Sequence, residues 1–507
     1  MFFNTMMLAA VAAEEATSYT FREETGFNHS TSLALTLLAR QLAISGDGST
    51  ALVSDQSADS RGDGQQTGSV AFYTKSGTFW NFAAQRSPSV SGIRFGSGIV
   101  LSEDGSTALI GAERENNNRG AVYVYHNTGS SWQQQQKLNP ASANGQYVGQ
   151  QNTLTISADG NTAVLGSYQN PNTGVTWVYT RSGTTWSLQQ YIIGAGTGTE
   201  LAGGTTLYAS GEIVELSADG NTLAMKMQRY NSSGGPGEDG VRVYTRSGNT
   251  FSFAQDLDVN VGGEKLCTDI SVSSDGSYIV VGVEGGKNAS NTVTGGVEVY
   301  KKSGSTWSLS ATLFPSDGAS GDDFGRRVQV SGDGKTVAVG APVHSSSRGA
   351  IYVYRRDGLT WTQDQKLQHA NIASNDDLTE DGLAMADNGH TILANIYSGS
   401  TTYTKEFEAA YPSIATGSYA IAFAENSTAT VETYTANGAT PITWSVTGTD
   451  ASAFSINSSG ELTFVTPPDF ENPTDAGSNN VYNATITATN SFGSASEDIT
   501  VTVTDAD

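Results

Sequence analysis

Residues 324–342 read Phe324-Gly-Arg-Arg-Val-Gln-Val-Ser-Gly-Asp-Gly-Lys-Thr-Val-Ala-Val-Gly-Ala-Pro342, with a Ser-x-Asp-Gly turn between two runs rich in valine. The turn recurs as Ser45-Gly-Asp-Gly48, Ser102-Glu-Asp-Gly105, Ser157-Ala-Asp-Gly160, Ser217-Ala-Asp-Gly220 and Ser273-Ser-Asp-Gly276, and in degenerate form as Ala386-Asp-Asn-Gly389. Successive turn glycines lie 55 to 60 residues apart. A period of this length is typical of repeat architectures. The spacing therefore predicts seven copies of one structural unit.

Each unit contains four short strand-forming runs, which in the second unit are 95–101, 107–112, 120–125 and 132–138. Alternating apolar residues and Asp-Gly or Ser-Gly pairs between the runs are typical of antiparallel strands joined by tight turns. A lone sheet of this kind leaves two faces and two edges open, and stacking copies around an axis covers them. We therefore predict an all-β protein with a seven-bladed β-propeller of four-stranded antiparallel blades over residues 18–408.

The two ends of the repeat region complement each other. The seventh unit lacks a fourth strand of its own, whereas residues 18–27 precede a first unit that already has four. We predict that the strand 18–27 closes the propeller as the outer strand of its last blade.

The Phe-Gly and Gly-Ala-Pro motifs of residues 324–342, with Phe95-Gly96 and Gly111-Ala112 as a second copy, resemble the FG-GAP repeat of integrin-α-type propellers. The resemblance covers about residues 30–405 and implies a recognition module. Integrin-type repeats often bind calcium through an Asp-x-Asp-x-Asp-Gly loop between their first two strands. This chain has only the Ser-x-Asp-Gly turn there, so no calcium site is expected in the propeller.

A different domain follows the repeats. Residues 409–418 are predicted to be a linker, and residues 419–507 contain alternating strand-like runs whose number and length suit a β-sandwich of the cadherin or immunoglobulin type. The motifs Ala424-Glu-Asn-Ser427, Pro468-Asp-Phe-Glu471, Ala488-Thr-Asn490 and Val503-Thr-Asp-Ala-Asp507 resemble those of cadherin-like domains.

In cadherin-like domains the acidic residues of these motifs meet at one pole of the sandwich and bind calcium. The resemblance therefore implies a Ca²⁺ site formed by Glu425, Asp469, Glu471 and Asp505. Calcium prefers six to eight oxygen ligands, and carboxylates gathered at one pole would repel one another without a cation. The alternative is that these are ordinary solvated acidic residues in an acidic chain.

The composition excludes several classes of protein. The 26 basic and 50 acidic residues give a formal charge of −24, which repels phosphate backbones and argues against a nucleic-acid partner. Cys267 is the single cysteine, so a disulfide framework within the chain is impossible. No apolar run is long enough to insert in a membrane as a helix. Residues 1–17 include a short apolar segment that resembles either a signal peptide or a docking segment.

The usual local signatures of catalysis are missing from the sequence, so we expect no enzymatic activity. The histidines, at positions 29, 126, 344, 369 and 390, are isolated and are expected in solvated loops. The paired carboxylates Asp322-Asp323 and Asp376-Asp377 are expected on the surface. The recurrent tryptophans at 132, 186, 307 and 361 are expected to pack between blades rather than to bind glycans.

These features together predict a non-enzymatic adhesion or recognition protein, located extracellularly or on a cell surface, with a protein or glycan as its surface ligand. One alternative is a structural or receptor-binding component of a virion surface. Another is a carbohydrate-active propeller enzyme, which would need two carboxylates about 5 to 9 Å apart in a pocket on the propeller axis. A homo-oligomer or a larger assembly remains open.

Overall fold

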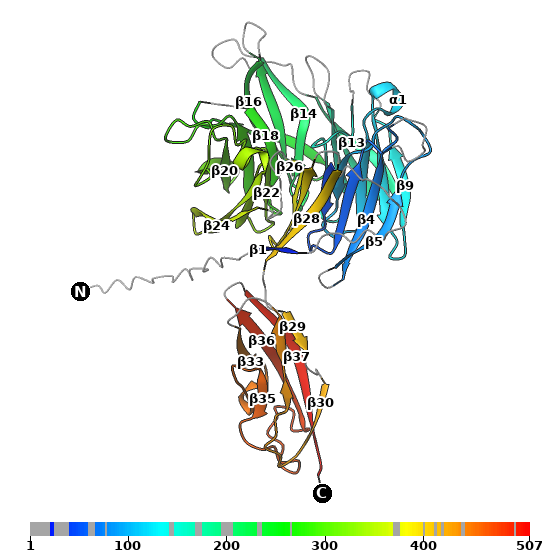
Figure 1. Ribbon diagram of the computed structural model, residues 1–507. Helices are drawn as coiled ribbons and strands as arrows, with labels where there is room; N and C mark the ends of the chain where they lie inside the picture. Colours follow the sequence, from blue (N-terminus) through cyan, green and yellow to red (C-terminus); the bar gives the residue numbers. More distant parts are fainter. Residues whose placement is uncertain are drawn as a thin grey trace, which may run out of the picture. The chain divides into compact units, whose positions relative to one another are not determined.

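The computed structural model describes residues 21–24, 40–58, 66–76, 79–140, 147–167, 175–193, 206–230, 236–263, 266–368, 376–398, 401–409, 413–416, 420–437, 442–490 and 493–506. The chain divides into two compact units, of which the first includes residues 23–408 and the second residues 409–507 (Figure 1). The apolar segment 1–17 lies outside the described residues.

The first unit contains seven four-stranded sheets among the described residues. Their strands are β2 (Gln41–Ile44), β3 (Thr50–Asp55), β4 (Ser69–Ser76) and β5 (Phe79–Arg86); β6 (Phe95–Leu101), β7 (Thr107–Ala112), β8 (Ala121–Asn127) and β9 (Trp132–Leu138); β10 (Leu154–Ile156), β11 (Thr162–Gly166), β12 (Val175–Ser182) and β13 (Thr185–Ile193); and β14 (Thr206–Leu216), β15 (Thr222–Tyr230), β16 (Pro236–Ser247) and β17 (Thr250–Asp258). The next are β18 (Leu266–Val272), β19 (Tyr278–Glu284), β20 (Gly296–Ser303) and β21 (Thr306–Leu313), followed by β22 (Arg327–Val330), β23 (Thr336–Ala341), β24 (Ala350–Asp357) and β25 (Thr360–Leu367).

The last sheet has the order β1-β28-β27-β26, formed by β26 (Asp376–Met385), β27 (Thr391–Ser398), β28 (Thr401–Ala409) and β1 (Phe21–Glu24). The described part of the expected closing strand is therefore the outermost strand of that sheet. Short helical turns, α1 (Glu115–Asn118) and α2 (His344–Ser347), join the second and third strands of two sheets. The fold is thus the expected all-β propeller.

Each Ser-x-Asp-Gly turn is held by its own side chains. In the third sheet, the Ser157 hydroxyl donates to Asp159 Oδ1 at 2.6 Å and accepts from the backbone N–H of Thr162 at 2.9 Å. Asp159 Oδ1 also accepts from the Asn161 N–H at 2.9 Å. The turn ends at Gly160, whose φ of +63° suits glycine best. The repeated motif is therefore a hairpin turn that caps the first two strands of each sheet.

Backbone hydrogen bonds join the seven turns into a closed ring. They run from Gly46 N to Glu103 O, Asp104 N to Ala158 O, Ala158 N to Ala218 O, Asp219 N to Ser274 O, Ser274 N to Gly332 O, Gly332 N to Asp387 O, and Asn388 N to Gly46 O, with lengths of 2.8 to 3.4 Å. The last of these bonds connects the seventh turn to the first. The sheets thus follow one another around an axis, with their first strands innermost.

Apolar side chains fill the space between neighbouring sheets. Trp132 lies against Phe72 of the preceding sheet, with ring centroids 4.6 Å apart, and is buried. Trp186 donates from its indole nitrogen to Gln135 of the preceding sheet at 2.9 Å. The tryptophans therefore pack between blades, as predicted.

The second unit is a β-sandwich. Its larger sheet has the order β30-β37-β36-β33, and a three-stranded sheet has the order β31-β35-β34. The strands are β29 (Ser413–Thr416), β30 (Ala420–Ala424), β31 (Glu432–Thr433), β32 (Thr435–Asn437), β33 (Thr443–Thr447), β34 (Phe454–Ile456), β35 (Glu461–Phe464), β36 (Val481–Asn490) and β37 (Gly493–Thr504), with a 3₁₀ turn at Ala451–Ala453. Tyr434, Leu462, Ile486 and Val501 form the centre of its core.

The structure differs from the predicted linker at 409–418. Residues 413–416 form β29, which pairs with β32. The reason is that Ile414 packs against the apolar core of the sandwich, so the domain begins before residue 419.

Candidate functional site

The acidic cluster of the sandwich brings together three of the four residues predicted to bind calcium. One carboxylate oxygen from each of Glu425, Glu471 and Asp505 lies within 4.8 Å of the others. Glu425 is buried, whereas Glu471 and Asp505 are exposed. Glu425 directly follows β30, Glu471 lies in the loop after β35, and Asp505 directly follows β37. Segments far apart in the sequence therefore meet here.

Glu425 holds this end of the sandwich together. Its Oε2 accepts from the Phe470 N–H at 3.1 Å, and its Oε1 accepts from the Ala506 N–H at 3.1 Å. The Glu425 N–H in turn donates to Thr504 O at 3.0 Å. One carboxylate thus fixes both of the other acidic motifs, which explains their convergence without a bound ion.

Asp469 lies apart from this group. Its two carboxylate oxygens accept from the backbone and side-chain nitrogens of Asn472, each at 3.0 Å, and these bonds lower the pKa of Asp469. In contrast, the pKa of Glu471 is raised. A hydrogen bond from its own backbone N–H lowers this pKa, but desolvation and the charges of Glu425, Asp505 and Asp469 together outweigh that hydrogen bond. A cation would relieve this repulsion, and carboxylates suit a hard cation such as Ca²⁺.

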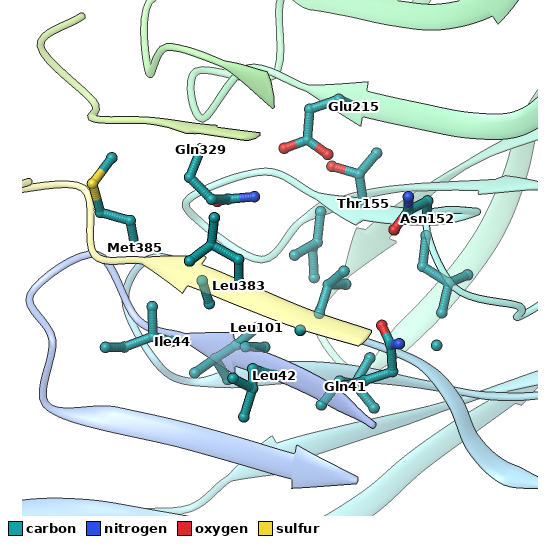
Figure 2. A pocket seen from close by; sticks show the side chains of 18 of the residues that line it. Gln41, Leu42, Ile44, Leu101, Asn152, Thr155, Glu215, Gln329, Leu383 and Met385 are labelled. Atoms are coloured by element: carbon teal, nitrogen blue, oxygen red, sulfur yellow. The ribbon is translucent and has the colours of Figure 1, made fainter. Parts of the chain in front are cut away.

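A second candidate site is a cavity of about 220 Å³ on the propeller axis. It is lined by residues of the innermost strands β2, β6, β10, β14, β18, β22 and β26 and of several Ser-x-Asp-Gly turns. Figure 2 shows Glu215, Thr155, Asn152 and Gln329 on one side and apolar side chains, including Leu383, on the other. Polar side chains therefore gather on one side of the cavity, whereas the other side is mixed, with Gln41 next to the apolar residues.

Two carboxyl groups meet where the ring of turns borders the cavity. Glu103 and Asp387, the second residues of their turns, are hydrogen-bonded to each other. The Ser274 hydroxyl lies 2.7 Å from Asp387 Oδ2 and 3.2 Å from Glu103 Oε1. Desolvation and the bond to Asp387 raise the pKa of Glu103 to about 8. The pair therefore shares a proton at neutral pH.

Glu215 and Asp269 are the other acidic residues of the cavity wall. Burial, and then the charges of Asp269 and Asp387, raise the pKa of Glu215 well above its usual value. Burial also raises the pKa of Asp269, although the positive charge of Arg327 and the Val328 N–H, 3.0 Å from Asp269 Oδ2, act in the opposite direction. Sequence analysis missed this cavity because each strand contributes only a few of its residues.

A buried polar network surrounds His344, which sequence analysis placed in solvent. His344 Nε2 accepts from Lys366 Nζ at 2.8 Å, so Nδ1 carries the proton and donates to Asp322 Oδ2 at 2.7 Å. Lys366 also pairs with Asp317 at 2.7 Å, and Asp317 accepts from the Tyr352 hydroxyl at 2.8 Å. The expectation of a solvated His344 and a surface Asp322 is therefore wrong, because each is the other's buried partner.

The remaining histidines and the cysteine offer no comparable cluster among the described residues. His29 and His369 lie outside those residues. Burial lowers the pKa of His390 to about 4, with a smaller contribution from Arg355. Cys267 is buried, and burial raises the pKa of its thiol, which keeps it protonated and unreactive. Within the described part of the chain, no helix has the length and apolarity needed to cross a membrane.

Comparison with known proteins connects one part of the chain to a family. Residues 307–354, which span β22, β23 and most of β21 and β24, match the FG-GAP repeat family. No curated protein matches the chain in sequence.

Several solved structures are similar at low identity. A protein described as a 6-phosphogluconolactonase from Bacteroides fragilis is 11% identical over 65% of this chain and 84% of its own, with a TM-score of 0.43. The WD40 repeats of RRP9 are 11% identical over 78% of this chain and 100% of their own, with a TM-score of 0.44. The periplasmic gluconolactonase of Pseudomonas aeruginosa is 16% identical over 66% of this chain and 86% of its own, with a TM-score of 0.42.

Proposed function

We propose that this chain is a non-enzymatic recognition or adhesion protein that acts outside the cell or on its surface. In this proposal a seven-bladed propeller binds a protein or glycan ligand, and a cadherin-like module binds Ca²⁺. The FG-GAP match at residues 307–354 is the observation that carries the proposal, because repeats of this family resemble those of integrin-α-type recognition propellers.

One pair of axial carboxyl groups does not have the arrangement that a glycosidase needs. In a glycosidase, two carboxyl groups stand on either side of the bond that is cleaved and are separated by at least about 5 Å. Glu103 and Asp387 instead bond directly to each other, which leaves no room for a substrate between them. This pair therefore does not fit the carbohydrate-active alternative.

The acidic cluster supports the calcium part of the proposal. Glu425, Glu471 and Asp505 present oxygens within 4.8 Å of one another, two of the residues at the surface. Such an exposed group of three carboxylates would bind Ca²⁺ weakly unless a partner supplied further oxygens. We therefore expect calcium to strengthen attachment to the ligand as well as to stabilise the sandwich.

Calcium binding is tested by isothermal titration of the full chain with CaCl₂. We expect binding in the micromolar to millimolar range that is lost in Glu471→Gln, which removes an exposed ligand without disturbing the bonds of Glu425. Glu497→Gln is a matched control because Glu497 is also an exposed glutamate of the sandwich, outside the cluster. Calcium heats that are equal in all three proteins would refute the proposed site.

Recognition is tested separately by applying the fluorescently labelled full chain to glycan arrays and to intact cells. We expect saturable binding that weakens when calcium is chelated. Failure to bind either surface, together with turnover of a lactone or glycoside substrate, would overturn the recognition proposal even if calcium binds.

A further inference from the structure

The axial cavity contains a carboxyl group with no partner. Glu215 is enclosed by protein, and the part of its surface that remains accessible faces the cavity. Among the described residues its carboxyl group forms no hydrogen bond and no ion pair, and the same is true of the side-chain amide of Gln329 nearby. Both side chains are partly exposed and line the cavity, so a ligand there is placed to supply the hydrogen bonds that they lack.

The other carboxyl groups around the cavity have partners. Asp269 accepts from the Asn152 side chain at 3.2 Å and from the Val328 N–H at 3.0 Å, and it is attracted to Arg327. Glu103 and Asp387 are bonded to each other. Glu215 is therefore the carboxyl group of the cavity that has no partner among the described residues.

The potential in the cavity favours a cation. Four acidic residues, Glu103, Glu215, Asp269 and Asp387, line it against one basic residue, Arg327. A positively charged ligand would give the Glu215 carboxyl group the partner it lacks, whereas an anion would be repelled by the other carboxylates of the cavity.

The shape of the lining distinguishes an organic cation from a metal ion. Among the described residues, the group of three carboxylates close enough to share a metal is that of the sandwich, and no three acidic side chains of this cavity approach so closely. Leu42, Leu101 and Leu383 form a small apolar wall in a lining that is otherwise mainly polar (Figure 2). This small wall suits a short hydrocarbon group, and a volume of about 220 Å³ limits the ligand to a small molecule.

We propose that the axial cavity binds a small organic ammonium ion. Its ammonium group pairs with Glu215 and donates to the oxygens of Thr155 and Gln329, and its hydrocarbon part lies against Leu42, Leu101 and Leu383. This site is independent of the proposed surface recognition and of the calcium cluster.

Binding has a consequence for protons. In the empty cavity, burial and the charges of Asp269 and Asp387 raise the pKa of Glu215 and so favour its protonated form. An arriving ammonium ion stabilises the ionised carboxylate, so the carboxyl proton passes to the buffer while the ammonium keeps its own. Binding is therefore expected to release protons from Glu215 to the buffer.

The test is isothermal titration of the full chain with hexylammonium chloride in two buffers that differ in ionisation enthalpy. We expect saturable binding with a net release of protons, and affinity weakened about tenfold or more in Glu215→Gln. Glu497→Gln, in the other unit, should bind as the unaltered protein does. Circular dichroism verifies that each variant is folded, and the amide of glutamine keeps the size and shape of the glutamate side chain.

Other outcomes would overturn the proposal. If hexylammonium does not bind, or binds equally to Glu215→Gln, the cavity is not an ammonium site. If neutral 1-hexanol binds as tightly as hexylammonium, the apolar wall alone is responsible. If CaCl₂ displaces hexylammonium and still does so in Glu471→Gln, the cavity is a metal site instead.

Discussion

The shared proton between Glu103 and Asp387 makes the stability of the ring of turns depend on pH. The pKa of Glu103 is raised from 4.5 to about 8 by desolvation and by its bond to Asp387. Between pH 4.5 and about 8, Glu103 is therefore protonated in the folded protein and ionised in the unfolded chain. The contribution of the pair is greatest below pH 4.5, declines as the pH rises towards 8, and is absent above it.

The size of the effect follows from the size of the shift. At about 1.4 kcal/mol for each pH unit, a rise from 4.5 to about 8 amounts to about 5 kcal/mol. Because Glu103 is only partly buried, solvent screening reduces this to about 1–2 kcal/mol. Glu103→Gln keeps a donor to Asp387 and an acceptor for Ser274 at every pH, so it removes the titration without removing the hydrogen bonds.

Hydrogen exchange of the amides that close the ring, such as those of Gly46 and Gly332, measures this directly. Comparing the unaltered protein with Glu103→Gln at the same pH cancels the base catalysis of exchange itself. We expect equal rates at pH 5 and rates about 5- to 30-fold faster in the unaltered protein at pH 9. A ratio that stays constant across this range would show that the pair shares no proton in the folded state.

Two further predictions concern the repeat itself. Ala386→Ser should raise the melting temperature of the propeller, with a gain of about 0.5–1.5 kcal/mol. The reason is that the new hydroxyl can accept a hydrogen bond from the Thr391 N–H, as the serine hydroxyls of the other turns accept from the residue five positions later. A lower melting temperature would mean that this turn has a different geometry. Gly111→Ala should destabilise the propeller by about 3 kcal/mol or more in calorimetry, because a Cβ there would lie 1.8 Å from the Gly149 carbonyl oxygen. Gly129→Ala, where nothing lies within 4 Å, should cost only about 1–2 kcal/mol for its positive φ.

The architecture was accessible from the sequence because its determinants are local. Ser157, Asp159 and Gly160 form their turn through hydrogen bonds within six residues, so the motif predicts the turn wherever it occurs. The acidic motifs of the sandwich could be brought together only through family resemblance. The resemblance did not distinguish Asp469 from the three residues that meet, because nothing in it indicates that the Asp469 carboxylate is hydrogen-bonded to Asn472.

The His344 network shows what a single sequence hides. Its partners Asp322 and Lys366 each lie 22 residues away, and nothing about an isolated histidine indicates them. Comparison between repeats supplies the missing signal. Glu115 occupies in the second sheet the loop position that His344 occupies in the sixth, and it pairs with Lys137 as His344 does with Lys366.

The same comparison explains which residues reach the axis. The second position of the turn is filled by Gly46, Glu103, Ala158, Ala218, Ser274, Gly332 and Asp387. Five of these are small, because the ring of backbone hydrogen bonds brings neighbouring turns so close that a Cβ on Gly46 would lie 3.1 Å from that of Glu103. Both acidic members lie beside the small Gly46, because a Cβ there would also be 3.4 Å from that of Asp387, and this brings Glu103 and Asp387 together. In the other five turns, packing keeps the residue at this position small. The contact between the two carboxyl groups therefore depends on closure of the ring and not on either turn alone.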